Sequence, residues 1–226
     1  MTRNHACIYC LTPYRAADLS GEPVVPAVLG GRLLLERAAC ADCSARVRER
    51  TDDFLARHFA PITEAIAGRG TPRPRRGSSG RAPSGASEPS PGQWRLAHRA
   101  AAKILYCYLL LELGDAALVS PPLETVRKYV TAVGPEPWTP RWEITRPPHS
   151  LSASWHVLSF DAVRPSAAAI GLFGTIWFRF RFDLEALAPK GGLLALDSVR
   201  GARGLAAHRH RGEWRYRAAP RWGWNR

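Results

Sequence analysis

The apolar positions that follow residue 43 recur at the spacing of one helix face. They fall three, four or seven positions apart, as in an amphipathic helix that covers a core. The residues concerned are Val47, Phe54, Leu55, Phe59 and Ile62. Because proline lacks a backbone N–H, we expect Pro61 to end or kink this helix.

Two further helices are predicted in the middle of the chain. Residues 93–115 carry an apolar face, and Gly114 is placed to end this helix. The face consists of Ala97, Ala101, Ile104, Tyr108 and Leu111. We expect Ser120 to cap a shorter helix, with Pro121 at its first position and Gly134 after its end.

Three short runs between residues 154 and 184 have the composition of β-strands. They cover residues 154–160, 167–174 and 175–184. In the last run an apolar face, made of Ile176, Phe178, Phe180 and Phe182, alternates with Trp177, Arg179 and Arg181. The second face suits nucleic acid, but an ordinary solvated sheet face has the same composition.

Two segments have a composition that does not form a packed core. Residues 68–92 consist mainly of Arg, Pro, Gly and Ser, which predicts a disordered, flexible linker. Residues 189–226 form a basic, aromatic tail that we expect to be poorly ordered. These segments divide an α+β protein into one folded unit at residues 1–67 and another at residues 93–188. The second unit should contain two helices and several antiparallel strands.

The formal net charge of +13 is concentrated in the same two segments. Residues 68–92 hold five Arg and one Glu, and residues 199–226 hold eight Arg and one Glu. Such charge favours a polyanionic partner, DNA or RNA. However, the chain has 29 Arg and 3 Lys, a bias that a GC-rich coding sequence also produces. The charge supports nucleic-acid binding without establishing it.

Nothing in the apolar pattern predicts a membrane protein. The first residues hold no apolar run of signal-peptide length, and the apolar run at residues 104–113 is too short to span a bilayer. We therefore expect a soluble, cytoplasmic protein with no membrane partner, and few disulfides in that compartment.

Two cysteine pairs carry the clearest chemical signal. Cys7 and Cys10 form one CxxC turn, and Cys40 and Cys43 form another. Four thiolates of this kind predict a tetrahedral structural Zn²⁺ site, with a rubredoxin-like iron site as the alternative. Four ligands leave no open position for catalysis. Cys107, inside an apolar helix, is predicted to be a core residue.

The segment between the two cysteine pairs resembles a known family. The pattern CxxC, then an acidic residue followed by His and Pro, then Leu-Gly-Gly, then CxxC-Asn is typical of the bacterial HNH endonuclease-like family. Besides the four cysteines, the matching residues are Glu22, Val24, Val25, Pro26, Leu29, Gly30 and Gly31. The resemblance covers about the first 60 residues and implies a zinc-bound ββα-metal core of treble-clef-like form.

The chain departs from this pattern at the positions that the resemblance makes catalytic. Pro23 stands where the family has the general-base His, and Ser44 stands where it has Asn. Proline has no titratable side chain, so it cannot activate water. Glu22 is a remnant of the site, and His5, His58 and Asp42 are the nearby groups that could compensate. The active site is therefore predicted to be degenerate, with no confident catalytic residue.

Three hypotheses about function follow from these observations. In the first, a catalytically impaired HNH-like zinc protein binds nucleic acid, with Arg46, Arg48 and Arg50 contacting phosphate. In the second, a displaced base and Mg²⁺ or Mn²⁺ support an active endonuclease. In the third, the zinc unit is the scaffold of a protein-interaction or regulatory factor.

Overall fold

The N-terminal part of the protein combines two β-hairpins with two helices. The computed structural model describes residues 4–31, 33–66, 90–132, 141–144, 155–160, 167–173, 176–181 and 193–198. The first hairpin pairs β1 (Asn4–Ala6) with β2 (Pro13–Arg15), and the second pairs β3 (Leu19–Pro23) with β4 (Leu34–Cys40). Helices α1 (Ala41–Arg50) and α2 (Asp52–Ile66) follow directly. One-turn 3₁₀ helices, η1 (Ala16–Asp18) and η2 (Ala27–Leu29), flank β3.

The helical region after Cys43 is broken at Thr51. The backbone N–H of Thr51 and its hydroxyl both donate to the carbonyl of Val47, which closes the last turn of α1. Helix α2 then starts at Asp52 and continues through Pro61. The helix therefore does not end at Pro61, and a kink at this residue stays a prediction. A proline inside a helix removes one backbone hydrogen bond, and here the flanking residues remain helical.

The second half begins with a long and a short helix. Helix α3 (Pro91–Leu113) starts at a capping box formed by Ser90 and Gln93, and it ends at Gly114 as predicted. After η3 (Asp115–Val119), helix α4 (Pro121–Thr131) begins with Ser120 at its N-cap. The Ser120 hydroxyl donates back to the carbonyl of Ala117 instead of capping α4. Gly134 lies outside the described residues.

Five antiparallel strands form the largest sheet. They are β5 (Arg141–Ile144), β6 (Trp155–Phe160), β7 (Ala167–Leu172), β8 (Ile176–Arg181) and β9 (Leu193–Ser198), in the order β5-β8-β7-β6-β9. The three predicted strands are β6, β7 and β8. Trp177 is buried on β8 and packs against Gly171, where a Cβ atom would lie 2.9 Å from the indole. Trp177 is therefore not on a solvated face; Phe182 lies outside the described residues.

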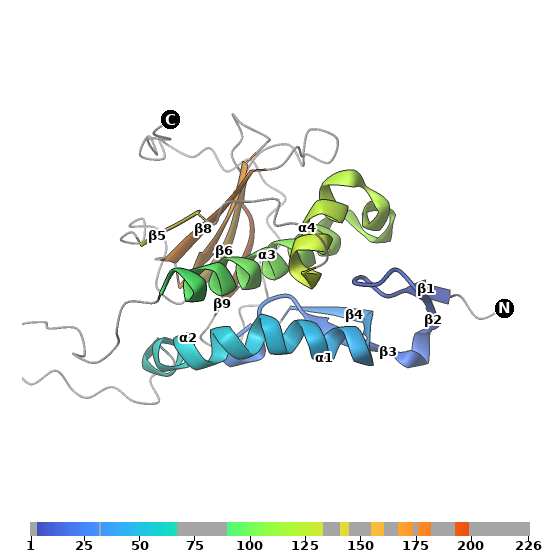
Figure 1. The fold of residues 1–226 in the computed structure, drawn as a ribbon, viewed down its shortest axis with the longest axis horizontal. Helices are drawn as coiled ribbons and strands as arrows, with labels where there is room; N and C mark the ends of the chain where they lie inside the picture. Colours follow the sequence, from blue (N-terminus) through green and yellow to red (C-terminus); the bar gives the residue numbers. More distant parts are fainter. Residues whose placement is uncertain are drawn as a thin grey trace, which may run out of the picture.

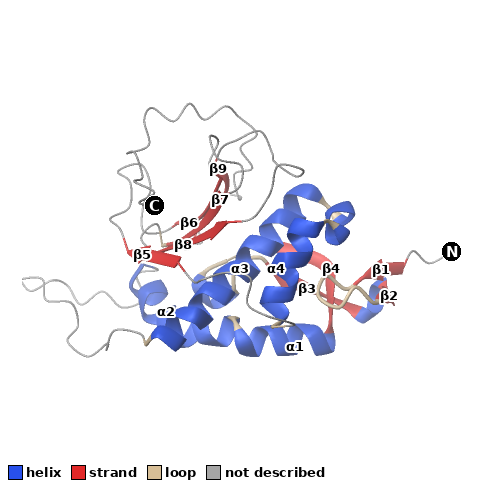
Figure 2. Ribbon diagram, turned by 45° about the horizontal axis from the view of Figure 1, so that its top comes forward, coloured by secondary structure: helices blue, strands red, loops and turns tan. Residues whose placement is uncertain are grey.

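Helix α3 lies between the sheet and the N-terminal helices (Figures 1 and 2). It contacts α2 and α4 as well as β5, β7 and β8. Every residue from Ala100 to Leu110 is at most 5 % exposed, so this stretch of α3 is covered on all sides. Buried residues of both halves form one hydrophobic cluster. An amphipathic pattern identifies one buried face of a helix, but it does not show that neighbouring elements cover the other faces.

The described elements confirm the predicted α+β class. Helices and antiparallel strand pairs occur in both halves. Among the described residues, no helix is both long and apolar enough to span a membrane. Most of the predicted linker at residues 68–92 and of the predicted tail at residues 189–226 lies outside the described residues, although the tail contributes strand β9. The proposed unit boundaries stay predictions.

Candidate functional site

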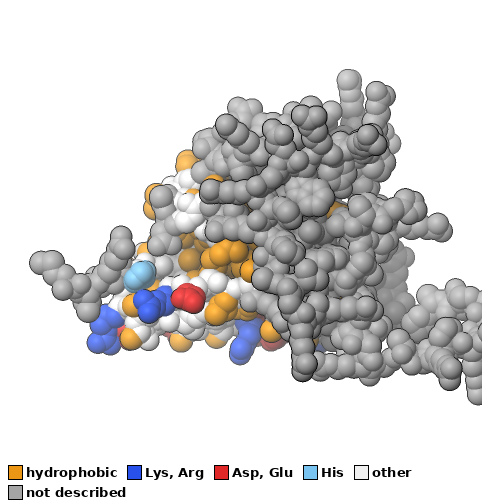
Figure 3. Space-filling view, turned by 180° about the vertical axis from the view of Figure 1, so that it is seen from behind, with side chains coloured by type: hydrophobic (Ala, Val, Ile, Leu, Met, Phe, Trp, Pro, Cys, Tyr) orange, Lys and Arg blue, Asp and Glu red, His pale blue; other side chains and the backbone are white. Residues whose placement is uncertain are grey.

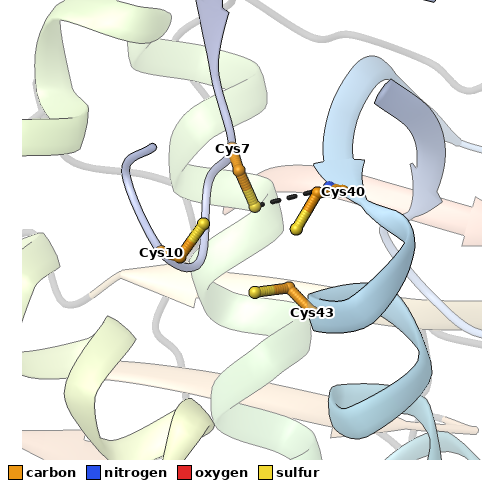
Figure 4. A group of neighbouring side chains, drawn as sticks. All are labelled: Cys7, Cys10, Cys40 and Cys43. Carbon is orange, nitrogen blue, oxygen red and sulfur yellow. Dashed lines mark hydrogen bonds between the residues drawn. The ribbon is translucent and has the colours of Figure 1, made fainter. Parts of the chain in front are cut away.

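Four cysteine sulfurs converge at one end of the N-terminal unit. Cys7 and Cys10 come from the turn after β1, Cys40 ends β4, and Cys43 lies in the first turn of α1 (Figure 4). All four Sγ atoms lie within 4.8 Å of one another. Among the described residues, this is the one group of three or more His, Cys, Asp or Glu side chains close enough to share a metal ion.

Local backbone structure holds both cysteine turns. The N–H of Cys7 donates to the carbonyl of Thr12, and the N–H of Leu11 donates back to the carbonyl of Cys7. Leu11 adopts the left-handed conformation, with φ of 62°, which closes this turn. In the second turn, Cys40 is the N-cap of α1, so the first helical turn carries Cys43 toward the other sulfurs. The CxxC spacing therefore produces two tight turns that face each other.

Two N–H groups donate to cysteine sulfur. The backbone N–H of Cys40 lies 3.4 Å from Sγ of Cys7, and Nη2 of Arg46 lies 3.4 Å from Sγ of Cys43. Donors of this kind orient thiolate ligands and offset their negative charge. These two donors therefore favour the ionised form of the sulfurs that they contact, which is the form that binds metal.

The thiols differ in how readily they ionise. Burial raises the pKa of Cys43 to about 12, although the hydrogen bond from Arg46 acts in the opposite direction. Burial also acts to raise the pKa of Cys10, but hydrogen bonds from Thr12 and neighbouring thiols outweigh it and lower that pKa to about 7. Four ionised thiols at one point repel each other, so a bound cation is needed to hold all four as thiolates.

The arrangement fits a tetrahedral metal ion. With Zn–S bonds of about 2.3 Å, the sulfurs of a tetrahedral site lie about 3.8 Å apart. Sulfurs that already lie within 4.8 Å need only a small contraction to reach this geometry. The donor set is a structural metal site consistent with zinc, in which Cys7, Cys10, Cys40 and Cys43 would hold the ion.

The Leu-Gly-Gly segment forms the turn that follows β3. Leu29 is fully buried, and Gly30 has a left-handed φ of 90°. A Cβ atom on Gly31 would lie 2.1 Å from the carbonyl oxygen of Val25, so only glycine fits there. The carbonyl of Leu29 accepts a 2.9 Å hydrogen bond from Nε2 of the buried His156. The segment thus returns the chain from β3 to β4 in a fixed conformation.

Lys103 fills the space next to Glu22 and Pro23. Its ammonium nitrogen lies 2.7 Å from Oε1 of Glu22, 3.2 Å from Oδ2 of Asp52 and 2.8 Å from the carbonyl oxygen of Pro23. An ammonium group has three N–H donors, so these three acceptors satisfy it completely. The three charged residues are buried, at 0 %, 3 % and 8 % exposure for Lys103, Glu22 and Asp52.

The Lys103 ammonium stays charged in this environment. Burial alone would lower the pKa of Lys103, but the carboxylates of Asp52 and Glu22 outweigh burial and raise it above its ordinary value. The Thr51 hydroxyl shares its single proton between the carbonyl of Val47 and Oδ1 of Asp52, which lies 3.0 Å from the hydroxyl oxygen. Glu22 is therefore held in a closed ion-pair cluster, where it is shielded from solvent and already partnered.

The other predicted residues lie elsewhere. Ser44 is partly exposed on α1, next to Cys43, and Arg46, Arg48 and Arg50 are exposed on the same helix. Asp42 is also exposed there, whereas Asp52 is the carboxylate that joins Glu22. His5 lies on β1, and His58 on α2 hydrogen-bonds to the carbonyl of Phe54. Cys107 is fully buried, as predicted.

Sequence reasoning missed Lys103 and Asp52. Lys103 is a lone charge inside the apolar run of α3, and a lone charge there calls for a buried partner because an unpaired one is costly. That signal was present in the sequence. The identity of the partners was not, because Glu22 and Asp52 are 81 and 51 residues away.

The two hairpins, the four-sulfur centre and the helix that starts at Ala41 define a small ββα unit with a metal-binding cluster. Residues 7–60 match the model of the HNH endonuclease family, so this part of the chain is similar to that family. The resemblance inferred from the sequence is thereby confirmed. No curated protein and no solved structure matches the chain.

Proposed function

We propose that this HNH-like zinc-binding protein binds nucleic acid through its N-terminal unit and has lost the hydrolytic activity of its family. The observation that carries the proposal is the Lys103 ammonium, which is buried between Glu22, Asp52 and the Pro23 carbonyl. A buried ion pair occupies the place where a hydrolytic centre would need an open, ionisable group.

Loss of hydrolysis rests on three features. Pro23 offers no proton acceptor for water in its side chain. Its carbonyl and the Glu22 carboxylate already accept from Lys103. A divalent cation that used Glu22 would have to displace this ammonium and enter a site without water, at a large desolvation cost. The same features argue against an active endonuclease with a displaced base.

Nucleic-acid binding rests on the family and on the charge of α1. The match to HNH endonucleases makes nucleic acid the expected partner class. Arg46, Arg48 and Arg50 are exposed on this helix, where they are proposed to contact phosphates. On the face drawn in Figure 3, the visible side chains of the described residues include basic, acidic and apolar groups side by side.

The salt dependence of binding tests this half of the proposal. A protein that neutralises three phosphates of duplex DNA should lose about 40-fold in affinity between 50 and 200 mM salt, since each contact contributes a slope of about −0.9. Labelled duplex DNA and single-stranded RNA would be titrated with the full chain across this range. Affinity that does not change with salt would contradict phosphate contacts, and absence of binding would favour the protein-interaction hypothesis.

A further inference from the structure

A pocket lies between α1 and α4, beside the cysteine cluster. It has a volume of about 200 Å³, and its lining includes Cys10, Cys43, Arg46, Arg50 and Arg127. A water molecule occupies about 30 Å³ of liquid, so the pocket has room for a phosphate group and part of its hydration shell. Three guanidinium groups around one small space make anion binding the chemistry to consider.

The three arginines are held in place from two distant parts of the chain. Arg46 and Arg50 are one helical turn apart on α1, whereas Arg127 projects from α4. Nη1 of Arg50 donates to the carbonyl of Thr131, which ties the end of α1 to α4 over 3.2 Å. Nη1 of Arg127 donates to the carbonyl of Tyr9 in the first cysteine turn, over 3.0 Å.

These contacts use only part of the hydrogen-bonding capacity of the arginines. A guanidinium has five N–H donors in a planar fork. The Nε atom of Arg127 is buried and has no partner within the described part of the chain. Because this atom is inaccessible to solvent, an anion in the pocket would pair with the outer nitrogens of the fork, Nη1 and Nη2. The side chains are therefore positioned before the anion arrives, which lowers the entropy cost of binding.

The metal centre balances only part of the positive charge of the three arginines. A divalent cation neutralises half of the charge of four thiolates, and Arg46 contacts the sulfur of Cys43 directly. Asp42, on the same helix, also interacts with Arg46. Glu124 is 4.0 Å from Arg127 but lies closer to Lys128, at 2.8 Å. Arg50 and Arg127 donate to neutral backbone carbonyls, so their charge is the part that remains to attract an anion.

We propose that this pocket binds a single phosphate group, supplied by the backbone of a nucleic acid. The inference deepens the proposed function, and the nucleic-acid source rests on it. Arg127 of α4 thereby joins the surface that is proposed to contact nucleic acid. Arg46 and Arg50 line the pocket, whereas Arg48 does not. Free phosphate has the same chemistry, so the experiment must distinguish the two sources.

The test compares arginine variants of the full chain by anisotropy of a labelled DNA duplex. Arg46→Gln, Arg50→Gln and Arg127→Gln should each weaken binding about tenfold or more, as expected for loss of a hydrogen bond to a charged group. Arg48→Gln is the matched comparison, since it removes the same charge from the same helix. Arg48 is proposed to make an exposed phosphate contact outside the pocket, so its loss should weaken binding less, by about threefold. Metal content and the thermal midpoint identify any variant that does not fold. Arg127→Lys retains the positive charge of Arg127 but removes its planar set of N–H donors.

The outcomes separate this inference from the proposed function. Equal losses in all four glutamine variants would overturn the pocket while leaving nucleic-acid binding intact. If the wild type binds neither DNA nor RNA, inorganic phosphate is titrated at constant ionic strength. A thermal midpoint that rises with phosphate in the wild type and Arg48→Gln, but not in Arg46→Gln, would support the pocket with free phosphate as its source. No response to DNA, RNA or phosphate would overturn the pocket as well.

Discussion

The ammonium nitrogen of Lys103 lies 2.7 Å from Oε1 of Glu22, and both side chains are buried. This ion pair joins α3 to the end of β3, next to Pro23, the residue that the sequence resemblance aligns with the general base of HNH endonucleases. Asp52 and the Pro23 carbonyl complete the coordination of the ammonium. Glu22 is thus part of the packed core.

Replacing Lys103 with methionine should destabilise the protein strongly. Removing one partner of a buried ion pair leaves uncompensated buried charge, so Lys103→Met should reduce the free energy of unfolding by about 3–5 kcal/mol. Urea denaturation followed by circular dichroism measures this loss. Adding Glu22→Gln to Lys103→Met should recover part of the stability, because it removes one of the stranded charges.

Lys128→Met is the matched control for this change. Lys128 forms an exposed ion pair with Glu124 on α4, and exposed pairs contribute only about 0–1 kcal/mol. Similar losses of unfolding free energy in Lys103→Met and Lys128→Met would contradict a special role of the buried cluster. The same would follow if the effects of Lys103→Met and Glu22→Gln on this free energy simply added in the double variant.

The contrast between the cysteines and Lys103 shows what the sequence can and cannot predict. The cysteine turns are local, and each CxxC spacing places two sulfurs together through a few backbone hydrogen bonds. The Lys103 cluster depends on the packing of α3 against β3 and α2, which no local pattern encodes. Similarly, the break at Thr51 arises from side-chain and backbone bonds to one carbonyl, whereas the composition pointed to Pro61.

Removing the metal should unfold more than the cysteine turns. The hydroxyl of Tyr106 on α3 donates to the carbonyl of Ile8, inside the first turn, and Arg127 donates to Tyr9. Loss of the ion should therefore lower the thermal midpoint of the whole cooperative transition. Calorimetry before and after chelation measures the change, and metal analysis should find one zinc per chain.

Two cysteine variants make the metal prediction specific. Cys40→Ser should lose the metal, because it removes one of the four converging sulfurs. Cys107→Ala should retain it, since Cys107 is buried in α3 and is not among those sulfurs. Loss of metal in Cys107→Ala alone would contradict the assignment.

Two buried histidines should make the fold sensitive to acid. Burial lowers the pKa of both His98 and His156 to about 4, although hydrogen bonds to backbone carbonyls act in the opposite direction. Each imidazole is neutral in the fold, whereas in the unfolded chain it takes up a proton below about pH 6.5. Their contribution to stability is thus fully present above about pH 6.5 and is lost as the pH falls toward 4.

The size of this acid effect follows from the width of the pH window. At pH 5, each histidine should cost about 2 kcal/mol of unfolding free energy relative to pH 7. Denaturation of the wild type and of His156→Gln at several pH values measures how the free energy of unfolding changes with pH. The variant should have a shallower pH dependence than the wild type. Parallel slopes in the two proteins would contradict the prediction.

A combined binding and cleavage assay tests the central claim most directly. Labelled DNA and RNA would be incubated with a high concentration of the full chain in Mg²⁺ or Mn²⁺, and binding and cleavage would be measured on the same samples. Because Glu22 is held by Lys103, we expect complexes with retarded gel migration in which the nucleic acid stays intact. Cleavage by the wild type that Glu22→Gln abolishes would contradict it.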